Sequence, residues 1–136
     1  MKCLVLGAKG SIGSACVHSL KAADVEVFEQ DRTGVYQNCS KILGPADLED
    51  IDALTNLVNF CVSKKINTVV IAIGLYGPRP DNFEQAFDYS NRTMRVNAIA
   101  PLHFTEELLR LYRSNQCTHA LHVMALSSVT TKHLGG

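Results

Sequence analysis

The glycines at positions 7, 10 and 13 are the residues whose type and spacing point most directly to chemistry. They come directly after the apolar run of residues 3–6 and directly before a helical pattern. Glycine at such a junction lets the backbone turn tightly and come close to a phosphate, and the free N–H groups at the start of the helix hold the anion. The spacing therefore predicts a phosphate-binding loop. The loop is formed by Gly7, Lys9, Gly10, Ser11, Ile12 and Gly13.

An acidic residue, Asp31, follows the next predicted strand, which covers residues 25–30 and whose apolar part is residues 25–28. In a dinucleotide site, a carboxylate at this point accepts hydrogen bonds from the adenosine ribose hydroxyls. The order of strand, glycine loop, helix, strand and acid thus predicts a dinucleotide site. Asp31 should repel a 2′-phosphate, which favours NAD. Arg32 and Lys9 are cations that suit the extra phosphate of NADP, so NADP stays open, unless both are simply solvated surface charges.

The composition is that of an ordinary globular domain, with 46% apolar and 19% charged residues. A chain of 136 residues can bury one core, which predicts a single domain over residues 1–136. Its 13 basic and 13 acidic residues balance, and they form no block of like charge. This pattern argues against a nucleic-acid partner and against a membrane-binding patch. No apolar run in the sequence is long enough to cross a bilayer.

The five cysteines are scattered, at positions 3, 16, 39, 61 and 117, and they contain no C-x-x-C pair. Several fall on apolar faces, where buried free thiols are expected. The five histidines have no partner at metal-ligand spacing, so we expect no metal site. Scattered free thiols are typical of a reducing compartment, which predicts a cytoplasmic protein.

Strand and helix patterns alternate along the chain. The predicted strands are residues 2–6, 25–30, 40–43, 68–73 and 120–126, and helices are predicted after Gly10 and over residues 50–64 and 90–113. Asp47 or Asp50 is expected to cap the second helix. Alternation of this kind indicates a parallel sheet with helices on both faces. Right-handed crossovers give the strand order 3-2-1-4-5, which predicts a doubly wound, Rossmann-like α/β fold.

Further short motifs follow the glycine loop in a fixed order. They are Asp47-Leu48, Ala72-Ile73-Gly74, Val96-Asn97 and Ser127-Ser128. With these motifs and the GxxGxxG spacing, the sequence resembles the N-terminal half of the short-chain dehydrogenase/reductase family, in its extended or atypical branch. The resemblance implies that Asp47 and Leu48 lie beside the adenine ring and that residues 72–74 run along the cofactor. It also implies that Asn97 holds a water of a proton relay and that Ser128 is the catalytic serine.

Two of these assignments can also be read without the resemblance. Pro101 lacks an N–H, so the carbonyl of Asn97, four residues earlier, loses its helical donor and can bind water. The plain alternative is a kink that serves packing. Ser128 stands where a hydroxyl can cap a strand end by bonding to nearby backbone. The sequence leaves both alternatives open.

The Tyr-x-x-x-Lys pair on which the family's chemistry depends is absent from the sequence. The residues four positions after its four tyrosines are serine, proline, threonine and glutamine. A lysine at that position lowers the pKa of the tyrosine, which is about 10 for a free phenol and too high for a base at neutral pH. We therefore expect this chain alone to bind cofactor without turnover.

The predicted strand at residues 120–126 would be an exposed apolar sheet edge, which natural folds usually cover. We expect the chain to be part of a longer reductase; the alternative is that this edge pairs with another chain. The resemblance implies an NAD(P)-dependent oxidoreductase that transfers hydride to or from a carbonyl or hydroxyl of a small-molecule substrate. It is also compatible with a homodimer through the long helix. The alternative from another class is a non-catalytic NAD(P)-binding module or redox sensor.

Overall fold

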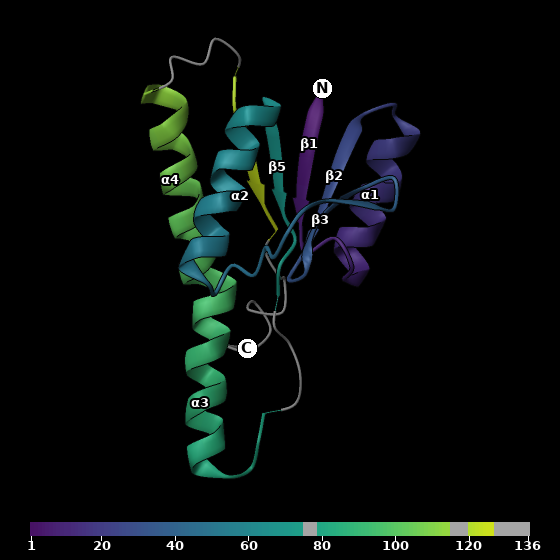
Figure 1. Ribbon diagram of the computed structural model, residues 1–136. Helices are drawn as coiled ribbons and strands as arrows, with labels where there is room; N and C mark the ends of the chain where they lie inside the picture. The colour runs from purple at the N-terminus through teal and green to yellow at the C-terminus, as the bar shows by residue number, and fades with distance from the viewer. Residues whose placement is uncertain (75–78, 115–119, 127–136) are drawn as a thin grey trace, which may run out of the picture.

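The computed structural model describes residues 1–74, 79–114 and 120–126. These residues form a six-stranded sheet with helices on both faces (Figure 1). In chain order the elements are β1 (Lys2–Leu6), α1 (Ser11–Ala22), β2 (Glu26–Asp31), β3 (Gly34–Gln37), β4 (Ser40–Leu43), α2 (Ile51–Lys64), β5 (Thr68–Ile71), α3 (Phe83–Met94), the π-helix η1 (Arg95–Ile99), α4 (Ala100–Ser114) and β6 (His122–Ala125). The Rossmann-like α/β fold predicted from the sequence is confirmed.

β1 lies at the centre of the parallel part of the sheet, between β2 and β5. Cys3 in β1 pairs with Val27 on one side and with Thr68 on the other, and β6 continues the parallel order beyond β5. Residues 3–6 have no exposed surface, as expected of a strand covered on both faces. Because these strands run in the same direction, the carboxyl ends of β1, β2 and β5 meet at one edge of the sheet.

Two apolar cores lie on opposite faces of the sheet. α1 contributes Val17 to the smaller core, which also contains Val5 and Val70. α2 and α4 contribute Leu57 and Phe104 to the larger core. This arrangement leaves the edge at the carboxyl ends of the strands bordered by loops and by the junction of α3 with α4 (Figure 1).

The sheet differs from the predicted one on the far side of β2 from β1. Residues 34–37 form β3, which the sequence prediction missed, and the sheet order is β4-β3-β2-β1-β5-β6. β3 runs antiparallel to β2 and to β4, so the predicted strand at Ser40–Leu43 exists but does not lie beside β2. The tight turn between β3 and β4 places Asn38 and Cys39 at positive φ, 50° and 68°. A two-residue hairpin turn favours such angles, but Asn-Cys lacks the usual glycine.

The long helical segment begins earlier than predicted and is not uniform. Asn82 caps α3 by accepting a hydrogen bond from the N–H of Gln85, so the helix starts at Phe83. α3 passes through η1 into α4. Of the two residues that the sequence offered as the cap of α2, Asp47 and Asp50, the structure has Asp50. None of the helices in the described ranges is both long and apolar enough to cross a membrane.

Candidate functional site

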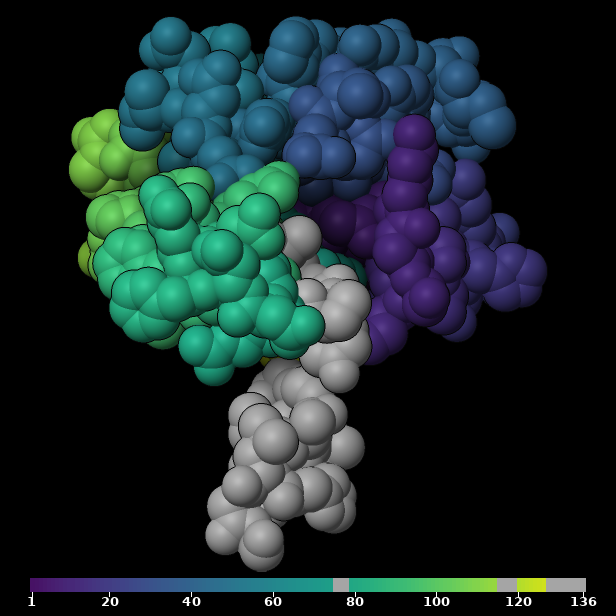
Figure 2. Space-filling view, turned by 90° about the horizontal axis from the view of Figure 1, so that it is seen from below, coloured from purple at the N-terminus to yellow at the C-terminus, as the bar shows by residue number. Residues whose placement is uncertain are grey.

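A pocket of about 590 Å³ lies at the carboxyl ends of β1, β2 and β5. Seen from below, this side of the molecule is hollowed between the purple N-terminal segment and green α3 (Figure 2). The pocket is lined by most of the residues that the sequence assigned to cofactor binding. They are Gly7, Lys9, Gly10, Asp31, Arg32, Asp47, Leu48, Ala72, Ile73 and Gly74. In an open α/β sheet, the crevice outside the carboxyl ends of the strands is where ligands bind.

The three glycines of the loop have different structural roles. Gly7 has φ +76°, and a Cβ there would lie 2.8 Å from the carbonyl oxygen of Ala72. A Cβ on buried Gly13 would lie 2.0 Å from the carbonyl oxygen of Gly7, so the turn itself requires both glycines. At Gly10 the nearest atom would be 3.6 Å away, an ordinary contact. The missing side chain of Gly10 therefore leaves room beside the pocket rather than relieving a clash within the protein.

The amino end of α1 faces this loop. Gly10 is the residue before α1 and has no side chain to cap it. The first N–H groups of α1 are therefore not bonded by a capping side chain. Ser11 and Ile12 form the exposed start of α1, and neither lines the pocket, nor does Gly13. The geometry is that of an anion site at a helix amino terminus, with open backbone donors and a glycine in front of them.

Asp31 is held by three polar contacts. Its Oδ2 lies 2.7 Å from the ammonium of Lys9. Its Oδ1 accepts hydrogen bonds from the N–H and the hydroxyl of Thr33, at 2.7 and 2.5 Å. Burial pushes the pKa of Asp31 upward, but the hydrogen bonds from Lys9 and Thr33 outweigh it and hold the pKa below its ordinary value. The carboxylate therefore stays ionised and available as an acceptor at neutral pH.

Gln30 is a site residue that the sequence reasoning missed. Its side chain is buried, its Oε1 accepts a hydrogen bond from the N–H of Gly7 at 2.9 Å, and its Nε2 donates to the carbonyl of Ala46 at 2.7 Å. Gln30 thus connects the glycine loop to the segment after β4. A polar residue inside an apolar strand, directly before the acid, was the signal that could have identified it.

Thr33 and Tyr36 were also missed. Thr33 lines the pocket, its hydroxyl lies 2.6 Å from that of Tyr36, and the ammonium of Lys9 lies 5.5 Å from the centre of the Tyr36 ring. Thr33 bonds to Asp31, and Tyr36 contacts Thr33 and Lys9, because β2 and β3 form a tight hairpin. Without the prediction of β3, the sequence carried no signal for them.

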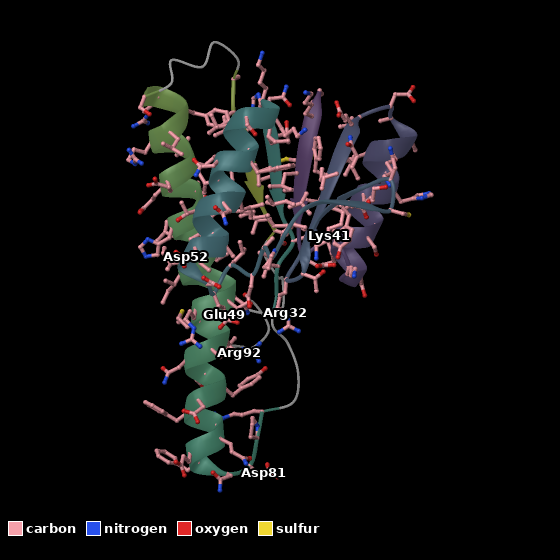
Figure 3. All side chains as sticks on the ribbon, viewed as in Figure 1. Arg32, Lys41, Glu49, Asp52, Asp81 and Arg92 are labelled. Carbon is pink, nitrogen blue, oxygen red and sulfur yellow. The ribbon has the colours of Figure 1, made fainter. Side chains whose placement is uncertain are left out.

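The opposite wall combines the loop before α2 with the long helical segment. Asp47 and Leu48, which the resemblance assigns to the adenine ring, line the pocket together with Glu49, Arg92 and Val96. Glu49 pairs with Arg92 of α3 and with Arg95 of η1. In Figure 3, Arg32, Glu49 and Arg92 gather near the junction of α3 and α4.

Of the two residues with an implied catalytic role, Asn97 is among the described residues and Ser128 is not. Asn97 lies in η1 and is exposed, and its neighbour Val96 lines the pocket. Pro101 stands at the second position of α4, and the N–H of Ala100 bonds to the carbonyl of Arg95, five residues earlier. The π-helix therefore sits at the point where the sequence predicted that Pro101 disturbs the helical bonding. Ser128 lies outside the described residues, and its role stays a prediction.

The cysteines of the described residues are free thiols, and two of them are buried. Cys3, Cys16, Cys39 and Cys61 are free, and burial raises the pKa of Cys3 to about 11 and raises that of Cys61 as well. Cys39 differs from the predicted buried thiols because it is exposed in the β3–β4 turn. Within residues 1–74, 79–114 and 120–126, no group of three or more His, Cys, Asp or Glu side chains could hold a metal ion.

The chain belongs to the NAD dependent epimerase/dehydratase family, whose model matches residues 3–131. Together with the short-chain dehydrogenases among the matching structures, this match confirms the resemblance predicted from the sequence. The family's NAD dependence agrees with the cofactor predicted from Asp31. No curated protein sequence matches the chain significantly.

Several solved structures share the fold. A short-chain dehydrogenase/reductase from Serratia marcescens is 22% identical with a TM-score of 0.69, and the match covers 96% of this chain and 58% of that one. A 4-hydroxyisoleucine dehydrogenase in complex with NADH is 20% identical with a TM-score of 0.72, and the match covers 96% of this chain and 57% of that one. MoeE5 in complex with UDP-glucose and NAD is 25% identical with a TM-score of 0.62, and the match covers 95% of this chain and 37% of that one. The fold is that of NAD-dependent oxidoreductases, and the chain spans only part of the length of these structures.

Proposed function

We propose that this chain is the nucleotide-binding part of an NAD-dependent oxidoreductase of the short-chain type. Such an enzyme transfers hydride to or from the carbon of a carbonyl or hydroxyl in a small-molecule substrate. The observation that carries the proposal is the convergence of the glycine loop, Asp31 and the Asp47-Leu48 pair on one pocket of about 590 Å³. A pocket of this size at the carboxyl ends of parallel strands suits an extended dinucleotide.

The residues that line the pocket fit the parts of NAD in order. The N–H groups at the start of α1 would bind the pyrophosphate, with Gly7 and Gly10 allowing its close approach. Asp31 would accept hydrogen bonds from the adenosine ribose, and Asp47 with Leu48 would border the adenine. Residues 72–74 would lie along the nicotinamide half, since a Cβ added at Gly74 would meet no atom of the described residues within 4 Å. When bound, the nicotinamide supplies or accepts the hydride.

Ser128 and Asn97 are the residues of this chain with an implied part in proton transfer. Ser128 would donate a hydrogen bond to the substrate oxygen, and Asn97 would hold a relay water. The sequence has no tyrosine with a lysine four residues later, and an unassisted phenol titrates near ~10. We therefore expect the chain alone to bind cofactor and to catalyse no turnover. The matched structures, of which the chain spans 37–58%, support a search for the missing pair in a longer protein.

Calorimetric titration with NADH and NADPH tests the proposal. We expect Asp31→Asn, which keeps the shape of the side chain, to weaken NADH binding by about tenfold through the loss of a charged acceptor. Asp31→Ala should weaken it at least as much. Asp88→Ala, at an exposed position of α3, is the control and should bind as the wild type does. A folded wild-type protein that binds neither cofactor would overturn the proposal.

The second candidate function is a non-catalytic NAD(P)-binding module or redox sensor. Such a module would use the same pocket and needs no Tyr-x-x-x-Lys pair, and these 136 residues contain none. A sensor must bind the oxidised and reduced cofactors with different affinities, because only a difference in affinity can shift its state. Equal dissociation constants for NAD⁺ and NADH would therefore argue against a sensor.

A second copy of this chain is the protein partner we propose. Large apolar side chains lie exposed along the α3–η1–α4 segment. They are Phe83, Phe87, Met94 and Leu102, with 84%, 61%, 59% and 57% of their surface exposed. The spacings of four and seven residues within α3 place the first three on one face of that helix. An exposed apolar stripe of this kind suits a helix of a second subunit.

A further inference from the structure

Glu49 connects the two walls of the pocket at the end assigned to adenine. Its Oε1 accepts a hydrogen bond from Nε of Arg95 at 3.2 Å, and its Oε2 lies 3.6 Å from Nε of Arg92. Its own backbone N–H donates to Oδ1 of Asp47 at 3.0 Å. One residue thus joins the loop before α2 to both α3 and η1 (Figure 3).

α3 is thinly attached to the rest of the described residues. It extends away from the sheet (Figure 1), and Ala86 is the buried residue that it contributes. α4, in contrast, buries Phe104 and Leu108 in the larger core. The π-helix η1 lies between them, and helices often change direction at such segments. Ion pairs from Arg92 and Arg95 flank this junction, so they are placed to fix the direction of α3.

The environment of Glu49 strengthens these contacts. Its side chain is 20% exposed, whereas those of Arg92 and Arg95 are 45% and 54% exposed. An isolated pair on the surface contributes little, but a partly shielded carboxylate shared by two guanidinium groups forms a small network. Removing the charge of Glu49 therefore weakens its ion pairs with both arginines at once.

We propose that Glu49 is a positioning residue for the adenosine half of the cofactor, a role that rests on the proposed function. Its contacts hold Asp47 and Leu48 opposite Arg92 and Val96. The adenine ring then enters a space whose two walls are already fixed, so binding orders fewer groups and loses less conformational entropy. Glu49 acts through these neighbours rather than on the reacting atoms.

Glu49→Gln tests this role because it keeps the size of the side chain and removes its charge. We expect the dissociation constants of NADH and AMP to rise by about three- to tenfold. The dissociation constant of nicotinamide mononucleotide should stay unchanged in ligand-observed NMR. Glu84→Gln, an exposed carboxylate in the first turn of α3, is the matched control and should leave all three values unchanged. An equal loss for AMP and nicotinamide mononucleotide would mean that Glu49 only supports the fold.

Two further outcomes separate this role from the proposed function. If the wild type binds NADH and Glu49→Gln binds it equally well, the positioning role is wrong and the proposed function stands. If the wild type binds no NADH, both are wrong. A double-mutant cycle with Arg95→Gln gives a second readout, since residues that act through one contact lose less together than the sum of their separate losses. Strictly additive losses would contradict the pairing.

Discussion

The ammonium of Lys9 lies 2.7 Å from Oδ2 of Asp31, where the glycine loop faces the end of β2. The other oxygen of the carboxylate, Oδ1, already accepts two hydrogen bonds from Thr33. A ribose hydroxyl that binds Asp31 must therefore share Oδ2 with Lys9 or displace the ammonium. Because Lys9 offsets the negative charge that would repel a 2′-phosphate, this ion pair weakens the discrimination of Asp31 against NADP.

Lys9→Met should change the preference between the two cofactors more than it changes the binding of NADH. The methionine keeps an unbranched apolar stem and removes the charge. We expect the dissociation constant of NADPH to rise about tenfold and that of NADH to change by about twofold or less, measured by fluorescence titration. Lys21→Met, which removes a surface cation paired with Glu29, is the control. Equal losses for the two cofactors would show that Lys9 does not distinguish them.

The same ion pair predicts a pH dependence. Despite the opposing effect of burial, hydrogen bonds from Lys9 and Thr33 hold the pKa of Asp31 below its ordinary value, and the hydrogen bond with Asp31 raises the pKa of Lys9 above its ordinary value. The lowered carboxyl pKa gives stability that is present above the unfolded pKa and is lost as the pH falls through the folded one. The raised lysine pKa gives stability that is present below the unfolded pKa and is lost as the pH rises through the folded one.

NADH binding should therefore stay constant between about pH 5 and about pH 9, because both members of the pair remain charged there. Calorimetry across this range, with Asp31→Asn measured alongside, checks the expectation. In the wild type, binding should weaken only as the pH falls through the lowered pKa of Asp31, below the ordinary carboxyl range, whereas the variant should lack this acid-side loss. A titration of wild-type binding near neutral pH would show that another group controls the site.

Gly13→Ala should lower the stability of the fold, whereas Gly10→Ala should weaken NADH binding. A Cβ at residue 13 would lie 2.0 Å from the carbonyl oxygen of Gly7, so we expect a loss of about 2–3 kcal/mol in the free energy of unfolding. At residue 10 the nearest atom is 3.6 Å away and φ is −71°, so the fold tolerates a methyl group, which enters the proposed pyrophosphate space. Chemical denaturation and NADH titration separate the two effects. If Gly10→Ala binds NADH like the wild type, the glycine loop is only a structural turn.

The parallel part of the sheet could be predicted because its signals are local. The continuous apolar run of β5 and the glycines after β1 each identify an element within a few residues. β3 could not be predicted in this way, because its turn to β4 uses Asn38 and Cys39 instead of glycine. Thr33 and Tyr36 depend on β3, so they were missed with it.

The wall of the pocket formed by α3 and η1 escaped prediction for a different reason. Glu49 and Arg95 are 46 positions apart, and no local period relates a loop residue to a residue on a later helix. The sequence assigned Asp47, Leu48 and Asn97 to the site through the resemblance, but Arg92 follows only from how α3 passes the end of the sheet. Predictions from the sequence therefore gave the strands' contribution to the site and the Val96-Asn97 motif, but not the ion pairs of Arg92 and Arg95 with Glu49.

The exposed stripe on α3 and α4 predicts self-association that substitution should abolish. Glu84 and Asp88 lie near the start of this segment, and Arg110 and Arg113 lie near its end. An antiparallel second copy, related by a two-fold axis near η1, would bring the acidic end of one segment to the basic end of the other. We expect a dimer in sedimentation velocity, a monomer for Phe87→Glu, and a dimer for the control Gln85→Glu at an exposed neighbouring position. A wild type that stays monomeric at high micromolar concentration, or a Phe87→Glu variant that stays dimeric, would contradict this interface.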